Sequence, residues 1–194
     1  TTRLVLYKYD KNGTLLHEST LTTVSDSSPA YVHKIIVDTE QQPVILGHFM
    51  NTVKFGDIVF EGRSMADAYL LKCNTDGSVK WATQIGKGEK YSMVGDLAFD
   101  SSENIYVSGG FANKTDQISL LLKFSPEGAK TWQFSVDRKV DTFYRGNIFG
   151  ASVKINSKDQ SIILAGNFKD NVAFGNTILT SQRGENEYDV FLTK

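Results

Sequence analysis

The chain has 194 residues, of which 40% are hydrophobic and 22% are charged, a composition typical of a globular protein that buries a substantial core. Its net charge is -1 and its lysines and arginines are scattered singly, which excludes the basic surface expected of a nucleic-acid or anionic-membrane binder. No apolar run approaches the roughly 20 residues of a membrane span. Residues 1–4 lack a signal-peptide core, so either a signal has been removed or the sequence begins inside a longer protein.

The first predicted element is a β-hairpin over residues 6–17 (LYKYDKNGTLLH), and its pattern returns twice and then begins again. The further copies are residues 70–81 (LLKCNTDGSVKW), residues 121–132 (LLKFSPEGAKTW) and the opening residues 192–194. Asp, Asn or Ser opens each turn, and Gly takes its fourth place, where a positive φ is required. Each copy is therefore predicted to be two strands joined by a type I turn.

A second predicted hairpin precedes each later copy of the first, at residues 35–49, 97–111 and 153–168. Each has an apolar strand that ends in Asp or Asn, a short polar loop, and a β-branched strand. Naming the four strands A to D, the chain reads C-D, then A-B-C-D twice, then A-B-C. No segment of ten or more residues keeps helical periodicity, so an all-β fold is predicted.

This order predicts one domain over residues 1–194 made of successive four-stranded antiparallel units. Residues 1–24 supply strands C and D of a preceding unit, residues 25–86 and 87–137 are complete units, and residues 138–194 lack the last strand. Four-stranded units in series are typical of β-propeller blades. A β-sandwich is the competing architecture, but it gives no reason for one hairpin to recur in phase. About three blades are present, so we expect an open arc or a fragment of a larger propeller, completed by further blades or another subunit.

Two of the connections between strands B and C contain a further hairpin signal. Residues 53–60 (VKFGDIVF) and residues 172–179 (VAFGNTIL) place Gly-Asp or Gly-Asn between short apolar strands. The middle unit lacks this insertion. We expect the inserted hairpins to extend strand pairing over a blade edge; the alternative is a lip around a ligand.

Residues 174–181 (FGNTILTS) and 188–194 (YDVFLTK), with residues 70–81 and 99–109 (FDSSENIYVSG), resemble the bacterial β-propeller repeat family labelled SBBP, which has NHL-like four-stranded blades. The resemblance covers nearly the whole chain, and it implies an exported protein (extracellular, cell-surface or periplasmic). Gln42 and Gln160 replace the family's turn Gly or Asn, which predicts looser turns. Asp67 and Asp189 match the family's Asp before strand C, and they are expected to accept backbone N–H groups.

Several single residues have simple structural interpretations. Cys73, the one cysteine, aligns with aromatic residues of the other copies and is predicted to be a buried thiol, with a reactive nucleophile as the alternative. The repeated lysines are expected to be snorkelling side chains on the blade face; they are Lys8, Lys72, Lys123 and Lys194. Glycosylation sequons begin at Asn12 and Asn113, the first of which is better explained as turn chemistry.

The long and variable connections, from strand D to A and from B to C, leave a four-stranded blade on one face. Binding residues are usually found on variable loops held by a rigid scaffold. Aromatic and arginine side chains, which are enriched at binding hot spots, are the predicted contacts there; they are Tyr91, Phe143, Tyr144 and Arg145, with Arg63 and Arg183 at the rim. The alternative for Tyr91 and Phe143 is packing between blades.

Signatures of catalysis are absent from the sequence. There is no Gly-rich phosphate loop after a strand, no H-x-x-x-H pair and no G-x-S-x-G. We therefore predict no catalytic residues, no cofactor and no metal. The predicted function is a non-catalytic binding or scaffold module of an exported protein that recognises protein or glycan. The alternatives are part of a hydrolase- or lyase-type propeller enzyme with its active site in other blades, and a structural spacer of a surface protein.

Overall fold

The computed structural model describes residues 2–24, 30–62, 67–86, 91–112, 117–138, 148–169, 171–182 and 187–194. Throughout these ranges all regular secondary structure is β-strand, which confirms the all-β prediction. The chain forms two compact units, Thr1–Lys87 and Gly88–Lys194. No helix long and apolar enough to cross a membrane occurs in the described part of the chain.

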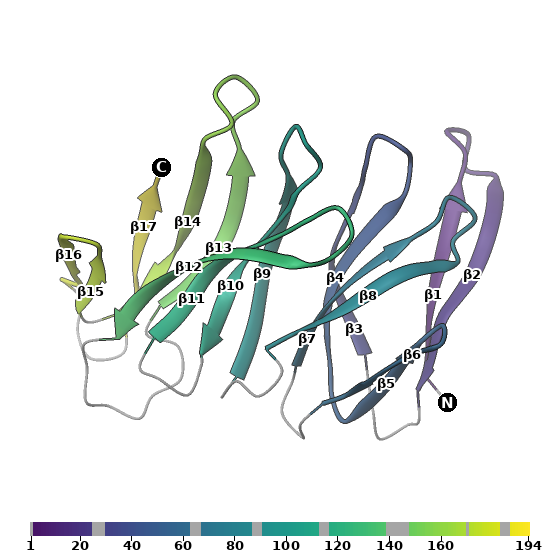
Figure 1. Ribbon diagram of the computed structural model, residues 1–194, viewed down its shortest axis with the longest axis horizontal. Helices are drawn as coiled ribbons and strands as arrows, with labels where there is room; N and C mark the ends of the chain where they lie inside the picture. The colour runs from purple at the N-terminus through teal and green to yellow at the C-terminus, as the bar shows by residue number, and fades with distance from the viewer. Residues whose placement is uncertain are drawn as a thin grey trace. The chain divides into compact units, whose positions relative to one another are not determined.

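The N-terminal unit contains two antiparallel four-stranded sheets (Figure 1), with strand orders β1-β2-β5-β6 and β3-β4-β7-β8. The strands are β1 (Thr2–Tyr9), β2 (Leu15–Val24), β3 (Ala30–Val37), β4 (Pro43–Phe49), β5 (Thr52–Phe55), β6 (Ile58–Glu61), β7 (Asp67–Cys73) and β8 (Val79–Ile85). The second sheet has the predicted A-B-C-D order. The first holds strands C and D of the preceding unit together with the inserted hairpin.

The C-terminal unit contains an antiparallel six-stranded sheet, β16-β15-β12-β11-β10-β9, and a three-stranded sheet, β13-β14-β17. The strands are β9 (Tyr91–Phe99), β10 (Ile105–Ala112), β11 (Gln117–Phe124), β12 (Lys130–Arg138), β13 (Ile148–Ile155), β14 (Ile162–Phe168), β15 (Asn171–Phe174), β16 (Thr177–Thr180) and β17 (Asp189–Thr193). The six-stranded sheet is again one A-B-C-D set extended by an inserted hairpin.

The inserted hairpins cover the edge of the preceding set of strands, as predicted. Strand β5 pairs with β2 where Thr22 meets Phe55, and Gly56 N–H donates to the carbonyl of Leu21 at 3.3 Å. In the C-terminal unit, β15 pairs with β12 where Asp137 meets Ala173. Each inserted hairpin therefore lies, in sequence, between strands B and C of one set of four strands, but it hydrogen-bonds to strand D of the preceding set.

The turns that join strands C and D have the predicted chemistry. The glycine N–H of each turn donates to the carbonyl of the first turn residue at 2.9–3.1 Å, and the glycines have φ of +77° to +83°. In the first turn, the Asp10 carboxylate also accepts the N–H groups of Asn12 and Thr14, each at 2.8 Å. These local bonds fix the register of each hairpin.

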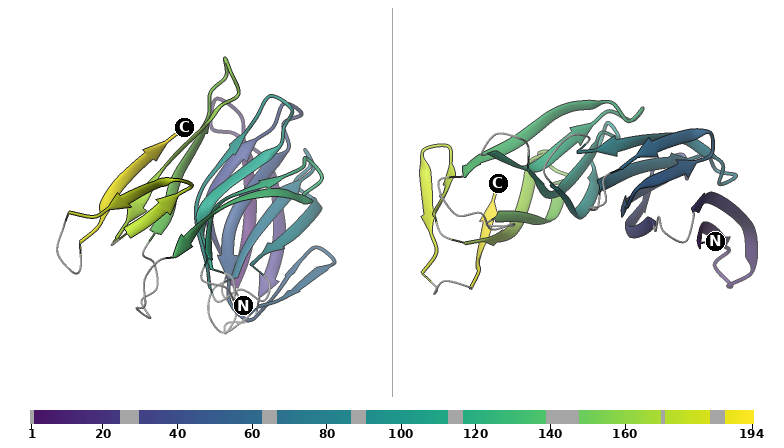
Figure 2. Two further views of the ribbon diagram at one scale, coloured as in Figure 1. Left: turned by 60° about the vertical axis from the view of Figure 1, so that its left-hand side comes forward. Right: turned by 90° about the horizontal axis from the view of Figure 1, so that it is seen from below.

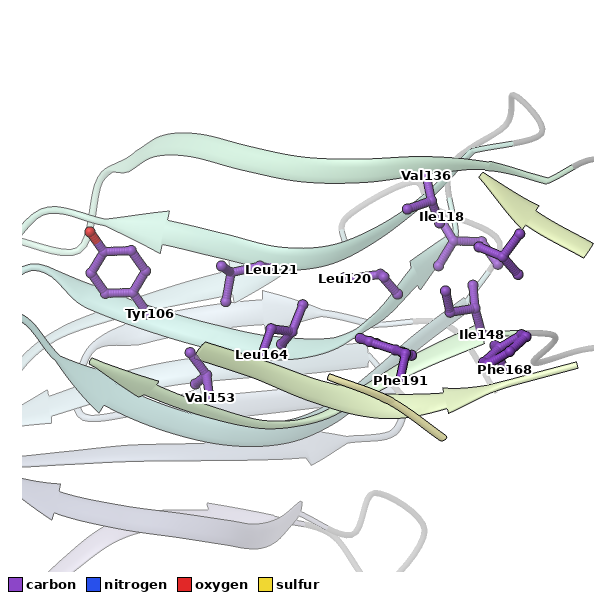
Figure 3. Close-up of a cluster of buried hydrophobic side chains, with 11 residues drawn as sticks. Tyr106, Ile118, Leu120, Leu121, Val136, Ile148, Val153, Leu164, Phe168 and Phe191 are labelled. Carbon is purple, nitrogen blue, oxygen red and sulfur yellow. The ribbon is translucent and has the colours of Figure 1, made fainter. Parts of the chain in front are cut away.

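Each unit has its own apolar core. In the N-terminal unit it centres on buried aromatic and aliphatic residues of both sheets, namely Leu21, Ile45, Phe49, Val53, Phe55, Phe60, Tyr69, Leu71 and Cys73. In the C-terminal unit (Figure 3), side chains such as Ile118, Leu120 and Leu121 of β11 face Val153 of β13 and Phe191 of β17. Cys73 is fully buried, and burial raises the pKa of its thiol to about 11, which confirms the prediction of a structural cysteine and keeps it protonated at neutral pH.

The turns between strands A and B are closed by backbone hydrogen bonds, and their looseness relative to the family's turns stays a prediction. Gln41 N–H donates to the carbonyl of Asp38 at 3.1 Å, and Gln160 N–H donates to that of Asn156 at 2.8 Å. Both glutamines adopt the left-handed conformation that glycine favours, with φ of +63° and +56°. The turn geometry is therefore kept at the cost of backbone strain, which sequence spacing does not reveal.

We expect Gln41→Gly to raise the free energy of unfolding by about 0.5–1 kcal/mol. Relief of the left-handed strain contributes about 1–2 kcal/mol, and the extra freedom of glycine in the unfolded chain offsets roughly 0.5–1 kcal/mol of it. Urea denaturation measures the difference. The matched control is Glu40→Gly one residue earlier in the same turn, which lacks a positive φ and should destabilise the protein. Equal effects of the two changes would contradict the role of strain.

The prediction of snorkelling lysines is wrong for Lys72. Its ammonium lies 2.7 Å from Oδ2 of Asp38, and the side chains are only 6% and 0% exposed. Lys123 and Asp100 repeat the pair at 3.4 Å in the next set of strands, where the lysine also lies over the ring of Tyr106. The strand C lysine thus pairs with the aspartate of the A–B turn. Where Asn156 replaces that aspartate, Lys194 pairs instead with the exposed Asp159 at 2.9 Å.

Candidate functional site

A groove of about 230 Å³ in the N-terminal unit is the candidate site, and we call it the tyrosine groove. It lies between the ends of β1 and β3 and the turn that joins β7 to β8. Its walls are Leu6, Tyr7, Lys8, Tyr9, His17, Ile35, Val37, Gln41, Pro43, Asn74, Thr75 and Gly77. The groove is therefore built from strand residues and from two short, hydrogen-bonded turns, and not from the long connections.

Large apolar side chains on two facing strands stay exposed at this groove. Tyr7 and Tyr9 of β1 are 48% and 56% exposed, and Ile35 and Val37 of β3 are 46% and 51% exposed. The two tyrosine rings lie 6.4 Å apart and are tilted by 32°. Contiguous exposed apolar groups of this kind are typical of interaction sites.

The position of β1 and β3 in their sheets contributes to the exposure. Each is the end strand of its four-stranded sheet, so on its outer side no strand from the described residues covers it. In the second copy of the hairpin, the residues aligned with Tyr7 and Tyr9 are Leu71 and Cys73, and in the third they are Leu122 and Phe124, all of them buried. The first copy therefore carries tyrosines, with a polar hydroxyl on a large apolar ring, where the second and third copies carry core residues.

Polar contacts hold one wall of the groove in place. The His17 ring nitrogen Nε2 and the Ser19 hydroxyl form a 2.5 Å hydrogen bond, and that hydroxyl donates to the carbonyl of Asp76 at 3.2 Å. A Cβ at Gly77 would overlap Ser19 Oγ, so glycine is required both for this close approach and for a φ of +77°. The β7–β8 turn is thus fixed against β2.

Hydrogen bonds from Ser78, through its hydroxyl and backbone N–H, hold the pKa of Asp76 below its usual value, so the carboxylate stays ionised at neutral pH. A mostly apolar concave surface with a few polar groups at its margin suits the binding of an apolar side chain or the face of a sugar ring. The one hydroxyl beside an imidazole at this wall is that of Ser19, which contacts His17 and also donates to the carbonyl of Asp76. No group of three or more metal-ligating side chains occurs in the described ranges.

The structure locates one of the six contact residues predicted from the sequence. Tyr91 begins β9, where its backbone pairs with Ala112 of β10. The other five residues, Arg63, Phe143, Tyr144, Arg145 and Arg183, lie outside the described residues, as does the sequon at Asn113. The prediction of a binding face on the long connections therefore stays a prediction.

The tyrosine groove was not predicted from the sequence, because the pattern common to the hairpin copies indicates their shared turn and strands and not the side chains in which the first copy differs. The usable signal was a departure from the repeat: Tyr7 and Tyr9 stand where Leu71 and Cys73 stand in the second copy. Exposure of Ile35 and Val37 has no comparable signal, since alternate apolar residues are equally typical of a covered strand.

A second polar cluster, also missed, lies across β3 and β4. His33 Nε2 and His48 Nδ1 form a 2.6 Å hydrogen bond, and the ring of Tyr31 stacks on that of His48 with centroids 4.6 Å apart. Burial and then the charge of His33 lower the pKa of His48, so His48 is neutral at pH 7. The cluster is separate from the residues that line the tyrosine groove.

Comparisons with known proteins identify no relative of this chain. No protein-family model matches the chain, and no curated protein matches it either.

Proposed function

We propose that the chain is a non-catalytic binding module of an exported or cell-surface protein, built as part of a β-propeller. Three features support the propeller: recurring A-B-C-D antiparallel sheets, hairpin copies in phase, and inserted hairpins that cover strand edges. The remaining blades would come from the same protein or from another subunit. The partner class is protein or glycan.

The observation that carries the binding proposal is the exposure of Tyr7 and Tyr9 at a formed groove. Tyrosine is enriched at binding hot spots because it supplies a large rigid contact area together with a hydroxyl. Ile35 and Val37 give the facing apolar wall. The turn held by His17 and Ser19 keeps the groove formed before a partner arrives, which lowers the entropic cost of binding.

We expect the double change Tyr7→Ser and Tyr9→Ser to weaken partner capture at least about tenfold, the loss of roughly 1.4 kcal/mol of contact energy. The measurement is binding to a panel of immobilised oligosaccharides and extended peptides. Thermal unfolding should change little, because both rings are about half exposed. Val59→Ser is the matched control, since Val59 is 55% exposed but does not line the groove.

A second variant distinguishes binding at the tyrosine groove from binding at the long connections. Changing Phe143, Tyr144 and Arg145 together to alanine should leave capture intact if the tyrosine groove is the site. Loss of capture in this variant, with full capture by the tyrosine variant, would move the site to the long connections. Turnover of a substrate by the unmodified chain would overturn the non-catalytic proposal.

A further inference from the structure

His33 of β3 and His48 of β4 bring two ring nitrogens together on one sheet, and we call them the histidine pair. The two strands lie side by side (Figure 1 and Figure 2). His33 Nε2 and His48 Nδ1 are 2.6 Å apart, and the ring centroids are 4.8 Å apart. A neutral imidazole carries one N–H and one lone pair, so one of the facing nitrogens donates and the other accepts. Both nitrogens therefore point at a single shared proton.

The register of β3 on β4 explains how two histidines 15 positions apart meet. Tyr31 stands opposite His48 and Val32 stands opposite Gly47, and the pairing then shifts, so that His33 is the extra residue of a β-bulge. Bulges re-aim a side chain relative to its neighbours on the strand. Here the bulged residue carries its ring to the face of the sheet on which Tyr31 and His48 lie.

One half of the histidine pair is held firmly. The ring of Tyr31 stacks on that of His48, with centroids 4.6 Å apart and planes tilted by 21°. The carbonyl of Tyr31 accepts the hydroxyl of the fully buried Tyr69 at 3.0 Å, which fixes the backbone of β3 at this point. His48 is partly buried, whereas His33 is exposed. The pair thus combines a positioned imidazole with one that can turn and that solvent can reach.

The histidine pair lies on the face of the sheet opposite to the core of the N-terminal unit. Side chains alternate along a strand, and Ile45 and Phe49 of β4 enter that core, so His48 points to the other face. Neither histidine lines the tyrosine groove. The geometry of the pair is therefore set by β3, β4 and Tyr69 of β7, and it is independent of the function proposed for the tyrosine groove.

Two converging imidazoles can hold a metal ion in place of the shared proton. The ring that donates the N–H changes tautomer and carries its proton on the other ring nitrogen, so both facing nitrogens then offer a lone pair and no proton is released. Metal–nitrogen bonds of about 2.0–2.1 Å at a right angle separate two nitrogens by roughly 2.9 Å, close to the spacing of the pair. Rotation of the exposed His33 side chain is enough to convert the hydrogen bond into a chelate.

We propose that the histidine pair binds Cu²⁺, with His33 Nε2 and His48 Nδ1 as adjacent ligands and solvent water in the remaining positions. Imidazole nitrogen suits copper, nickel and zinc, and of these Cu²⁺ has the highest affinity for a given set of ligands. Structural zinc sites take four protein ligands and catalytic ones take three. The described part of the chain offers no group of three or more such side chains, so the pair favours the ion that binds most tightly through two.

The test titrates the whole chain with copper(II) chloride in a buffer that does not coordinate metals, followed by isothermal titration calorimetry. Saturable binding of one ion per chain is expected, with an electron paramagnetic resonance spectrum that shows splitting from two equatorial nitrogens. Ni²⁺ and Zn²⁺ should bind more weakly. Because the ion binds the folded state, it should also raise the melting temperature of the protein.

Three variants locate the ion. His33→Gln and His48→Gln should each weaken copper binding at least about tenfold, and the double variant should bind no more weakly than either single one, because the chelate is already lost. Val32→Gln is the matched control: it introduces the same side chain at the neighbouring position of β3, which is 46% exposed, and it should bind copper as the parent does. Circular dichroism checks that each variant keeps the fold.

Three results would overturn the proposal. Absence of saturable copper binding by the parent would exclude the site. Unchanged binding by either His33→Gln or His48→Gln would show that the ion does not bridge the pair. Tighter binding of Zn²⁺ than of Cu²⁺ would refute the assignment to copper.

Discussion

Lys72→Ala is expected to lower the free energy of unfolding by about 3–5 kcal/mol, the usual result of removing one partner of a buried ion pair. The loss is large because the Asp38 side chain is 0% exposed and would keep its charge without a counter-ion. Asp38 cannot turn away, since its Oδ1 also accepts the backbone N–H of Gln42 at 2.8 Å. Urea denaturation at pH 7 provides the measurement.

The same pair predicts how stability depends on pH. Burial alone would raise the pKa of Asp38, but the hydrogen bond from Lys72 and the backbone N–H of Gln42 hold it below the ordinary value of 3.8. A carboxyl whose folded pKa is depressed contributes stability above its unfolded pKa, and that contribution is lost as the pH falls through the folded value. The parent should therefore lose stability below about pH 4, and Lys72→Ala should lose less over that range.

Two controls isolate the buried pair. Lys154→Ala removes a lysine that is 67% exposed and lies 3.6 Å from Asp96, and it should cost less than about 1 kcal/mol. The double change Lys72→Met and Asp38→Asn should recover most of the stability, because Asn156 serves the equivalent turn in the last set of strands. A Lys72→Ala loss no larger than that of Lys154→Ala would refute the role of the buried charge.

Gly47→Ala is expected to destabilise the protein by at least about 3 kcal/mol, at the upper end of the range for overpacking. A Cβ at this position would overlap the carbonyl oxygen of Tyr31 and lie 2.5 Å from Cζ and Oη of Tyr69. The Tyr69 hydroxyl donates to that carbonyl at 3.0 Å, directly across the glycine. Neither group has room to move, because the Tyr69 side chain is fully buried.

The last set of strands repeats this arrangement and supplies a second test. Gly166 lies beneath the ring of Phe191, and a Cβ there would overlap the carbonyl oxygen of Phe149. Gly166→Ala should therefore cost a similar amount. Gly175→Ala is the contrasting change: nothing lies within 4 Å of its Cβ, so only the strain of a φ of +58° remains, about 1–2 kcal/mol. Thermal melts of the Gly47→Ala, Gly166→Ala and Gly175→Ala variants compare the cost of steric overlap with the cost of a positive φ. Equal losses of stability in the three variants would contradict the overlap argument.

The strands and turns were predictable from the sequence because they depend on neighbours along the chain. The turn that ends at Gly77 follows from Asn, Gly and the alternating apolar residues around them. The inserted hairpin at residues 53–60 was recognisable from Gly-Asp between apolar strands. Its edge-covering role was also expected, but its exact partner, Thr22 of β2, was not.

What the sequence did not reveal depends on contacts between distant residues. The recurrence of a lysine in each copy does not reveal whether its side chain extends into water or forms an ion pair. Lys72 pairs with Asp38, which lies 34 positions before it (72 − 38). Tyr7 and Tyr9 have the side-chain types of a core strand, and their exposure depends on which other strands cover β1 rather than on their own sequence. The left-handed conformation of Gln41 is set by the tight turn around it, against the preference of its own side chain.

The inserted hairpins also bear on how the chain unfolds. Strand β5 lies, in sequence, between β4 and β7 of one sheet, yet it hydrogen-bonds to β2 of the other. Separating β5 from β2 therefore displaces the β5–β6 hairpin, which is joined in sequence to β4 at one end and to β7 at the other. In arrays whose repeats touch only across flat interfaces, terminal repeats fray independently. We therefore expect the inserted hairpin to couple the opening of the two sheets within the N-terminal unit.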